Sequence, residues 1–168
     1  VSKINSTKSI NKSKNIEDAK NESNEDTYNS NIIKDVNYSS KDAKGNEYII
    51  DASEGEIDYS KTNIIYLTNV IAIVKLINNN TTIKVTSDFG KYNTDNFDTI
   101  FSKNVIINYL ENKITGEYLD FSLKRNSMIV SRNVIYTNLE NILNADVIEL
   151  NIKTKDTKIF MYEDKKKV

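Results

Sequence analysis

Residues 52–70 read ASEGEIDYSKTNIIYLTNV, and residues 87–105 read SDFGKYNTDNFDTIFSKNV. The two stretches align without a gap, so that Gly55 matches Gly90 and both stretches end in Asn-Val. A third stretch, IVSRNV at 129–134, repeats the end of the second almost residue for residue. Self-similarity at a regular spacing is typical of stacked units, each of which buries one face against its neighbours.

Around this repeat, short runs rich in Ile, Val, Tyr, Phe and Thr alternate with clusters of Asn, Asp, Lys and Gly. That alternation indicates strands and turns. Strands are expected at 33–39, 47–52, 54–60, 64–77, 81–86, 89–93, 97–109, 114–123, 127–137, 145–153 and 157–162. A stack of such antiparallel hairpins predicts an all-β fold, an elongated and twisted open β-jelly roll whose interior is lined by alternate residues.

Composition excludes several classes of function. The 168 residues include no Cys, so a disulfide, a zinc-thiolate site and a cysteine nucleophile are impossible. They also include no His, the usual general base near neutral pH and the commonest metal ligand. We therefore expect no enzyme, no metal and no cofactor. The net charge of −1 argues against a nucleic-acid partner, which requires a basic face.

The chain divides into three parts by composition. Residues 1–31 are polar and charged with few apolar residues, which predicts a disordered linker. Residues 32–164 carry the strand pattern and form the expected domain, and residues 165–168 form a basic tail.

Six stretches carry a resemblance to a known family. They are GNEYIIDA (45–52), ASEGEIDY (52–59), YLTNV (66–70), SDFGKYN (87–93), FSKNV (101–105) and ADVIELN (145–151). In this order they resemble the LptA/LptC family of lipopolysaccharide export proteins, over about residues 33–162. The resemblance implies that the domain binds lipopolysaccharide by its acyl chains and moves it from the inner membrane toward the outer membrane. One departure is that Thr68, Lys103 and Arg132 stand where the family often has Gly.

Within the family, the long polar linker looks like the spacer of an LptC-like protein. The expectation is a periplasmic domain anchored to the inner membrane by an N-terminal helix absent from this chain. A random-coil linker of this length reaches about 30 Å, which would hold the domain close to the bilayer. The alternative is a soluble, LptA-like periplasmic bridge subunit, and the residues that precede Val1 would decide between the two.

Counting alternate residues along the strands predicts which side chains line the interior. If the two sheets splay open, these residues form a groove for acyl chains. If the sandwich is closed, they are ordinary core. The candidates are Tyr66, Val70, Ala72, Val74, Phe101, Val105, Ile107, Tyr109, Leu119, Phe121, Val134 and Tyr136.

Two cations fall on the same predicted face. At the mouth of a groove, Lys103 and Arg132 would contact lipid phosphates through charge-assisted hydrogen bonds. The competing interpretation is a solvated cation whose apolar stem packs on the surface.

An open jelly roll leaves a free strand edge at each end, and such edges accept strands from other chains. The candidate edge residues are Val36, Tyr38, Ile159, Phe160 and Met161. The resemblance implies strand addition by an inner-membrane lipopolysaccharide ABC exporter and an LptA-like bridge protein, and head-to-tail self-association.

Two other classes remain open from the sequence. A structural β-repeat protein of the cell envelope would show the same repeat without a lipid groove. A glycosidase would need a carboxylate pair such as Asp51 and Glu54, or Asp88 and Asp95, but both pairs stand beside predicted turns, where solvated acids are common.

Overall fold

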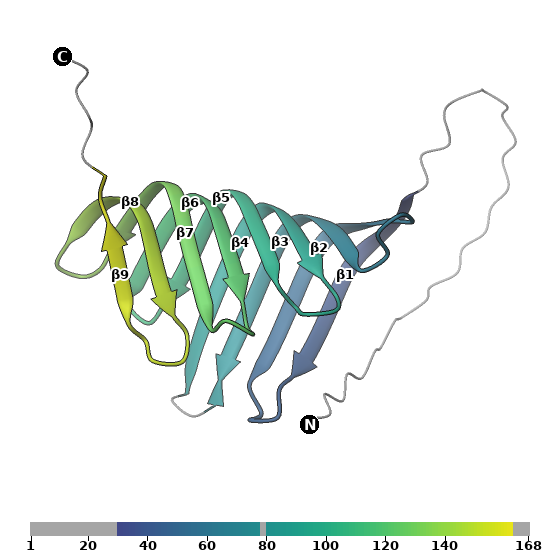
Figure 1. The fold of residues 1–168 in the computed structure, drawn as a ribbon, viewed down its shortest axis with the longest axis horizontal. Helices are drawn as coiled ribbons and strands as arrows, with labels where there is room; N and C mark the ends of the chain where they lie inside the picture. Colours follow the sequence, from purple (N-terminus) through teal and green to yellow (C-terminus); the bar gives the residue numbers. More distant parts are fainter. Residues whose placement is uncertain (1–29, 78–79, 163–168) are drawn as a thin grey trace, which may run out of the picture.

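The computed structural model describes residues 30–77 and 80–162, which form nine antiparallel strands and a single sheet. The strands are β1 (Ser30–Lys41), β2 (Glu47–Asp58), β3 (Ile64–Leu76), β4 (Thr81–Asn93), β5 (Thr99–Tyr109), β6 (Asn112–Ser122), β7 (Ser127–Thr137), β8 (Ile142–Asn151) and β9 (Thr157–Phe160). Each strand pairs with the next in the chain, so β1 and β9 are the two edges of the described sheet. Figure 1 shows the strands side by side along the long axis, curling over at the upper side of the view.

The all-β prediction is confirmed, with differences in the bounds of the strands. The segments expected at 47–52 and 54–60 form one strand, β2, and those at 81–86 and 89–93 form β4. β1 begins at Ser30, two residues before the expected start of the domain. The rest of the predicted linker, residues 1–29, and the predicted tail, residues 165–168, lie outside the described residues.

The bend of the sheet follows residues with positive φ in the middle of the strands. Asn69 in β3 has φ 52°, and Lys103-Asn104 in β5 and Arg132-Asn133 in β7 have φ between 51° and 67°. In β5 and β7 the hydrogen-bonded register shifts at these residues, as in a β-bulge. Asn adopts this left-handed conformation more readily than most residues. The repeated Asn-Val therefore marks the point at which each of these strands turns.

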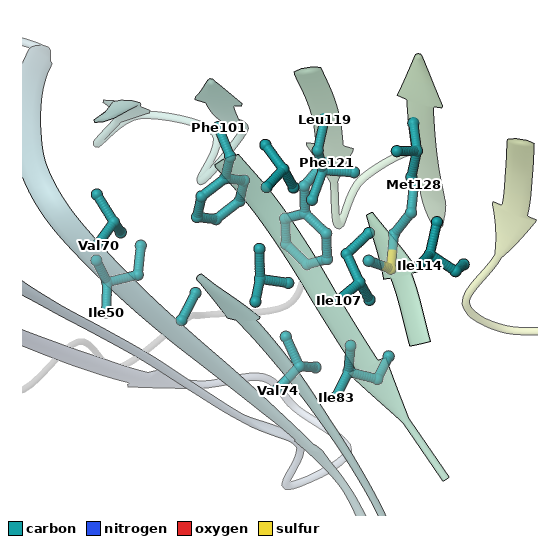
Figure 2. Packing of buried hydrophobic residues seen from close by; sticks show 14 of the residues in the cluster. Ile50, Val70, Val74, Ile83, Phe101, Ile107, Ile114, Leu119, Phe121 and Met128 are labelled. Atoms are coloured by element: carbon teal, nitrogen blue, oxygen red, sulfur yellow. The ribbon is translucent and has the colours of Figure 1, made fainter. Parts of the chain in front are cut away.

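This irregularity also changes which residues face inward. In β3 both Leu67 and Val70 are buried although they are three residues apart, and in β6 Gly116 and Leu119 show the same spacing. A regular strand would place such pairs on opposite faces. The turn at the bend therefore lets both halves of a strand present apolar side chains to one interior. Figure 2 shows buried apolar side chains from several strands, Val70, Phe101 and Leu119 among them, around this interior.

The repeated glycines lie where a side chain of the neighbouring strand leaves little room for a Cβ atom. A Cβ atom at Gly55 would lie 2.8 Å from Val36 Cγ2, and one at Gly90 would lie 3.1 Å from Val70 Cγ2. A Cβ atom at Gly116 would lie 2.8 Å from Val130 Cγ1. The equivalence of Gly55 and Gly90 in the repeat thus reflects space rather than backbone conformation.

Turns in this proline-free chain are held by Asn and Asp side chains. Asn138 Oδ1 accepts hydrogen bonds from the backbone N–H groups of Glu140 and Asn141. Asn151 Oδ1 does the same for Lys153 and Thr154. These side chains replace backbone partners in tight turns, which explains why Asn clusters between the strands.

Candidate functional site

The interior of the bent sheet contains most of the residues that the sequence predicted for it. Nine of the twelve candidates are buried: Val70, Ala72, Val74, Phe101, Val105, Ile107, Leu119, Phe121 and Val134. Tyr109 and Tyr136 are partly buried and pack against this cluster. Burial shows that these side chains share one interior, and lipid contact at these positions stays a prediction.

Tyr66 is a correction to the predicted interior. Its side chain is 43% exposed and lies on the outer face, where Lys91 Nζ is 5.9 Å from the centroid of its ring. The sequence count carried a regular alternation from Val70 back to Tyr66 across Asn69. Because the backbone of Asn69 is left-handed, Leu67 takes the inward position instead.

Lys103 and Arg132 are also placed differently from the expectation. Both lie at bulges in the middle of their strands, exposed on the outer surface and away from the turns that border the interior. Lys103 Nζ is 5.4 Å from the ring centroid of Phe89, and the Arg132 guanidinium is 5.4 Å from that of Tyr118. The bulge adds a residue to each strand, which removes these cations from the inward face.

The interior is largely filled by its own side chains. Phe101 is 1% exposed and Leu119 is fully buried. One void of about 30 Å³ is bordered by Val74, Phe101, Phe121 and other apolar residues. A void of this size holds only about one or two water molecules, so an acyl chain enters only when these side chains or the two halves of the sheet move apart.

A larger hollow of about 500 Å³ lies at the mouth of the bend. The β1–β2 turn lines it on one side, and residues of the β4–β5, β6–β7 and β8–β9 turns line it on the other. Four residues border both this hollow and the interior void: Ser40, Tyr48, Phe97 and Leu123. The hollow, called the vestibule below, therefore adjoins the apolar interior.

The polar lining of the vestibule is organised by Asp42. Asp42 Oδ1 accepts hydrogen bonds from the backbone N–H groups of Lys44 and Asn46, both at 2.9 Å. Asp42 Oδ2 accepts from Asn46 Nδ2 at 2.8 Å and from the Tyr48 hydroxyl at 3.1 Å. Partial burial raises the pKa of Asp42, but these hydrogen bonds outweigh it and the pKa lies below its ordinary value. Burial, and then the Asp42 charge, raise the pKa of Tyr48.

Sequence reasoning missed the vestibule. Its lysines, Lys41, Lys44, Lys124 and Lys153, belong to separate polar turns or to a strand end beside one, and a charge in a turn is usually only solvated. Asp95, the second carboxylate of the lining, accepts a hydrogen bond from Asn63 Nδ2 at 3.0 Å. The bend of the sheet brings these turns together, although they lie far apart in the sequence.

The two edges of the sheet are open. β1 pairs only with β2. β9 covers only Val147–Leu150 of β8, so among the described strands the first half of β8 pairs with β7 alone and its outer edge is open. Ile159 and Phe160 are 38% and 37% exposed. Met161, just beyond β9, is exposed as well, whereas Val36 and Tyr38 pack partly against the core. Both edges present backbone groups for strand pairing.

The carboxylates considered for a glycosidase are held in structural contacts. Asp51, Asp88 and Asp95 each accept a hydrogen bond from an asparagine side chain, at 2.5–3.0 Å. Glu54 forms an ion pair with Lys34. Across residues 30–77 and 80–162, no group of three or more acidic residues is placed to hold a metal ion. The same residues contain no helix with the length and apolar character to cross a bilayer.

Comparison with known proteins places this geometry in context. The model of a family described as "LptC: Lipopolysaccharide-assembly, LptC-related" matches residues 4–160. A search of curated proteins found no match to the chain.

Proposed function

Because this chain belongs to the LptC-related family of lipopolysaccharide-assembly proteins, we propose that its bent sheet takes the acyl chains of lipopolysaccharide into the interior during transport. Lipopolysaccharide transport is the role that membership of the family gives, and it is a transport and binding role rather than a catalytic one. The domain works on the periplasmic side of the inner membrane, toward the outer membrane.

The observation that carries the proposal is one continuous apolar interior that meets an open vestibule. All nine strands belong to a single sheet, so the two halves of the sheet are joined through the bend, and separation at the mouth breaks no strand pairing. Apolar burial contributes about 0.8 kcal/mol per CH₂ group. A few methylene groups therefore give an affinity that is useful and reversible, as a relay requires.

Beyond the shared rim of Tyr48, Phe97 and Leu123, an acyl chain that enters from the vestibule meets Phe101, Phe121 and Val74. All three border the small void, which in turn shares its rim with the vestibule. Displacing them costs packing energy, and acyl burial offsets that cost. The domain in this closed form is self-filled, and the lipid-loaded form requires the two halves of the sheet to open.

Strand addition at the free edges is the proposed contact with partners. The β1 edge and the β8–β9 edge are each suited to pair with a strand from the lipopolysaccharide exporter, from a bridge protein or from a second copy of this chain. Proline at Ile159 would remove a backbone donor from β9. This variant is expected to lose partner binding while the domain stays folded, and unchanged binding would contradict the assignment of this edge.

A role as an anchored LptC-like component is preferred to that of a soluble bridge subunit. The family match names LptC-related proteins, and this match supports the anchored role. A structural envelope protein without a lipid role has no specific observation in its favour.

Photo-crosslinking from neighbouring residues tests the proposed function. Val105 is 1% exposed and faces the interior, whereas the next residue, Ile106, faces the opposite side of β5. A crosslinker at Val105 is expected to capture purified lipopolysaccharide, and one at Ile106 is not. Capture at neither position would indicate a closed sandwich and would contradict the proposal.

A further inference from the structure

We propose that the vestibule binds the phosphate-bearing headgroup of the lipid, with lysines on both sides of the mouth as the anion contacts. This inference rests on the proposed function and assigns a polar subsite that the apolar interior does not provide. The four cations are Lys41, Lys44, Lys124 and Lys153.

The first argument is the placement of these lysines. Lys41 ends β1 and Lys44 lies in the β1–β2 turn, whereas Lys124 lies in the β6–β7 turn and Lys153 in the β8–β9 turn. In Figure 1 the β1–β2 and β8–β9 turns both lie at the lower side of the view, opposite the bend. Residues far apart in the sequence thus bring positive charge to one opening from two directions.

The second argument is charge. Within residues 30–77 and 80–162, the three ion pairs are Lys34–Glu54, Lys75–Glu47 and Arg125–Asp120, and none includes a vestibule lysine. The vestibule also contains Asp42 and Asp95, but their hydrogen bonds go to their own turn and to Asn63. Four cations face two carboxylates, so the lining has an excess of positive charge. Lys41 also interacts electrostatically with Glu47, so Lys44, Lys124 and Lys153 are the ammonium groups that are more available to an anion.

The third argument is that the vestibule leads into apolar surface. Tyr48, Phe97 and Leu123 border both the vestibule and the interior void. An amphiphile with its phosphates at the lysines would therefore have its acyl chains directed toward Phe101 and Phe121. A free phosphate ion would use the lysines but gain nothing from the apolar rim, so a lipid headgroup fits the site better than a small anion.

Mid-strand Lys103 and Arg132 do not compete for this role. They lie on the outer surface over aromatic rings and border neither the vestibule nor the void. The phosphate contact that the sequence analysis expected from Lys103 and Arg132 at a groove mouth is thus assigned to the vestibule lysines instead.

The test removes one lysine from each side of the mouth. The double variant Lys44→Gln/Lys124→Gln is compared with Lys84→Gln/Lys113→Gln, which removes the same charge from exposed positions of β4 and β6 outside the vestibule. Binding is measured for purified lipopolysaccharide, for the same lipopolysaccharide after phosphatase treatment, and for inorganic phosphate. Circular dichroism confirms that each variant is folded.

The vestibule variant is expected to bind intact lipopolysaccharide about tenfold more weakly, because each exposed charge contact changes affinity by roughly two- to fivefold. The control variant is expected to match the unmodified chain. Phosphatase-treated lipopolysaccharide is expected to bind the vestibule variant and the unmodified chain equally.

Three results would overturn the inference. If the vestibule and control variants bind intact lipopolysaccharide alike, the lysines are solvated and the acyl-binding proposal stands without them. If inorganic phosphate competes fully with lipopolysaccharide, the vestibule is a general anion site. If the unmodified chain binds no lipopolysaccharide in either form, the proposed function fails as well.

Discussion

Truncating Phe121 is expected to weaken the fold and to make the domain more receptive to lipid. Phe121 is 6% exposed and borders the void of about 30 Å³ together with Phe101. Phe121→Ala joins the space of the lost ring to that void. A buried Phe→Ala change costs about 3–5 kcal/mol of folding free energy, which includes the cost of the cavity.

That cost decides which concentrations of lipid are informative. A domain of this size has a free energy of unfolding of roughly 5–15 kcal/mol, so the change removes a large share of it. A ligand that binds only the folded state at a hundred times its Kd restores about 2.7 kcal/mol. In the variant, an acyl chain fills space that the ring occupies in the unmodified chain, so the restored free energy is expected to be larger than in the unmodified chain.

Urea unfolding with and without a monomeric acylated amphiphile measures this difference. The matched control is Ile148→Ala, a fully buried position in β8 that does not border the void. Its expected cost is about 2–5 kcal/mol. Equal restoration by the amphiphile in both variants, or none in either, would refute the idea that the void next to Phe121 is where acyl chains enter.

Three further predictions concern the construction of the sheet. Gly116→Ala is expected to lower the free energy of unfolding by about 1–3 kcal/mol, because the new Cβ atom would lie 2.8 Å from Val130 Cγ1. An unchanged midpoint of denaturant unfolding would show that Val130 and its neighbours accommodate the added methyl group. The backbone of Asn104 has a φ of 51°, so Asn104→Gly is expected to be about 1 kcal/mol more stable than Asn104→Ala, the reverse of the usual order in strands. A more stable Asn104→Ala variant would argue against the bend. The pKa of Asp42 lies below its ordinary value of 3.8, so the ionised form stabilises the fold above that pH and its contribution disappears as pH falls through the lower, folded pKa. The free energy of unfolding between pH 4 and 2 should therefore fall less steeply for Asp42→Asn than for the unmodified chain. If the two proteins lose stability in parallel, Asp42 does not contribute to the acid dependence of folding.

The fold class was readable from the sequence because strands and turns leave local patterns. Alternating apolar residues and the repeat that contains Gly55 and Gly90 predicted stacked antiparallel strands, and the structure has them. The bend could not be inferred from the repeat, because a residue of positive φ such as Asn69 interrupts the inward-outward alternation of side chains without any change in composition. Tyr66 was assigned to the wrong face for that reason.

The candidate site was predictable only in its apolar part. Residues such as Val105 and Leu119 are marked by alternation within one strand, so their burial could be inferred locally. The vestibule depends on how the bend brings Lys44 near the turns that contain Lys124 and Lys153. These turns are separated by many residues of chain, and their lysines match the pattern of any solvated turn.

The central claim is that acyl chains occupy the interior of the sheet, and a single tryptophan tests it most directly. The chain contains no Trp, so Phe121→Trp places a single tryptophan beside the void, and Phe89→Trp places one on the outer face, where Phe89 is 43% exposed. Each tryptophan is excited selectively at a wavelength that the ten tyrosines barely absorb. Lipopolysaccharide with bromine-labelled acyl chains is then added to each variant. The account predicts strong quenching of the tryptophan at position 121 and little at position 89. Equal quenching at both positions, or quenching at position 89 alone, would contradict it.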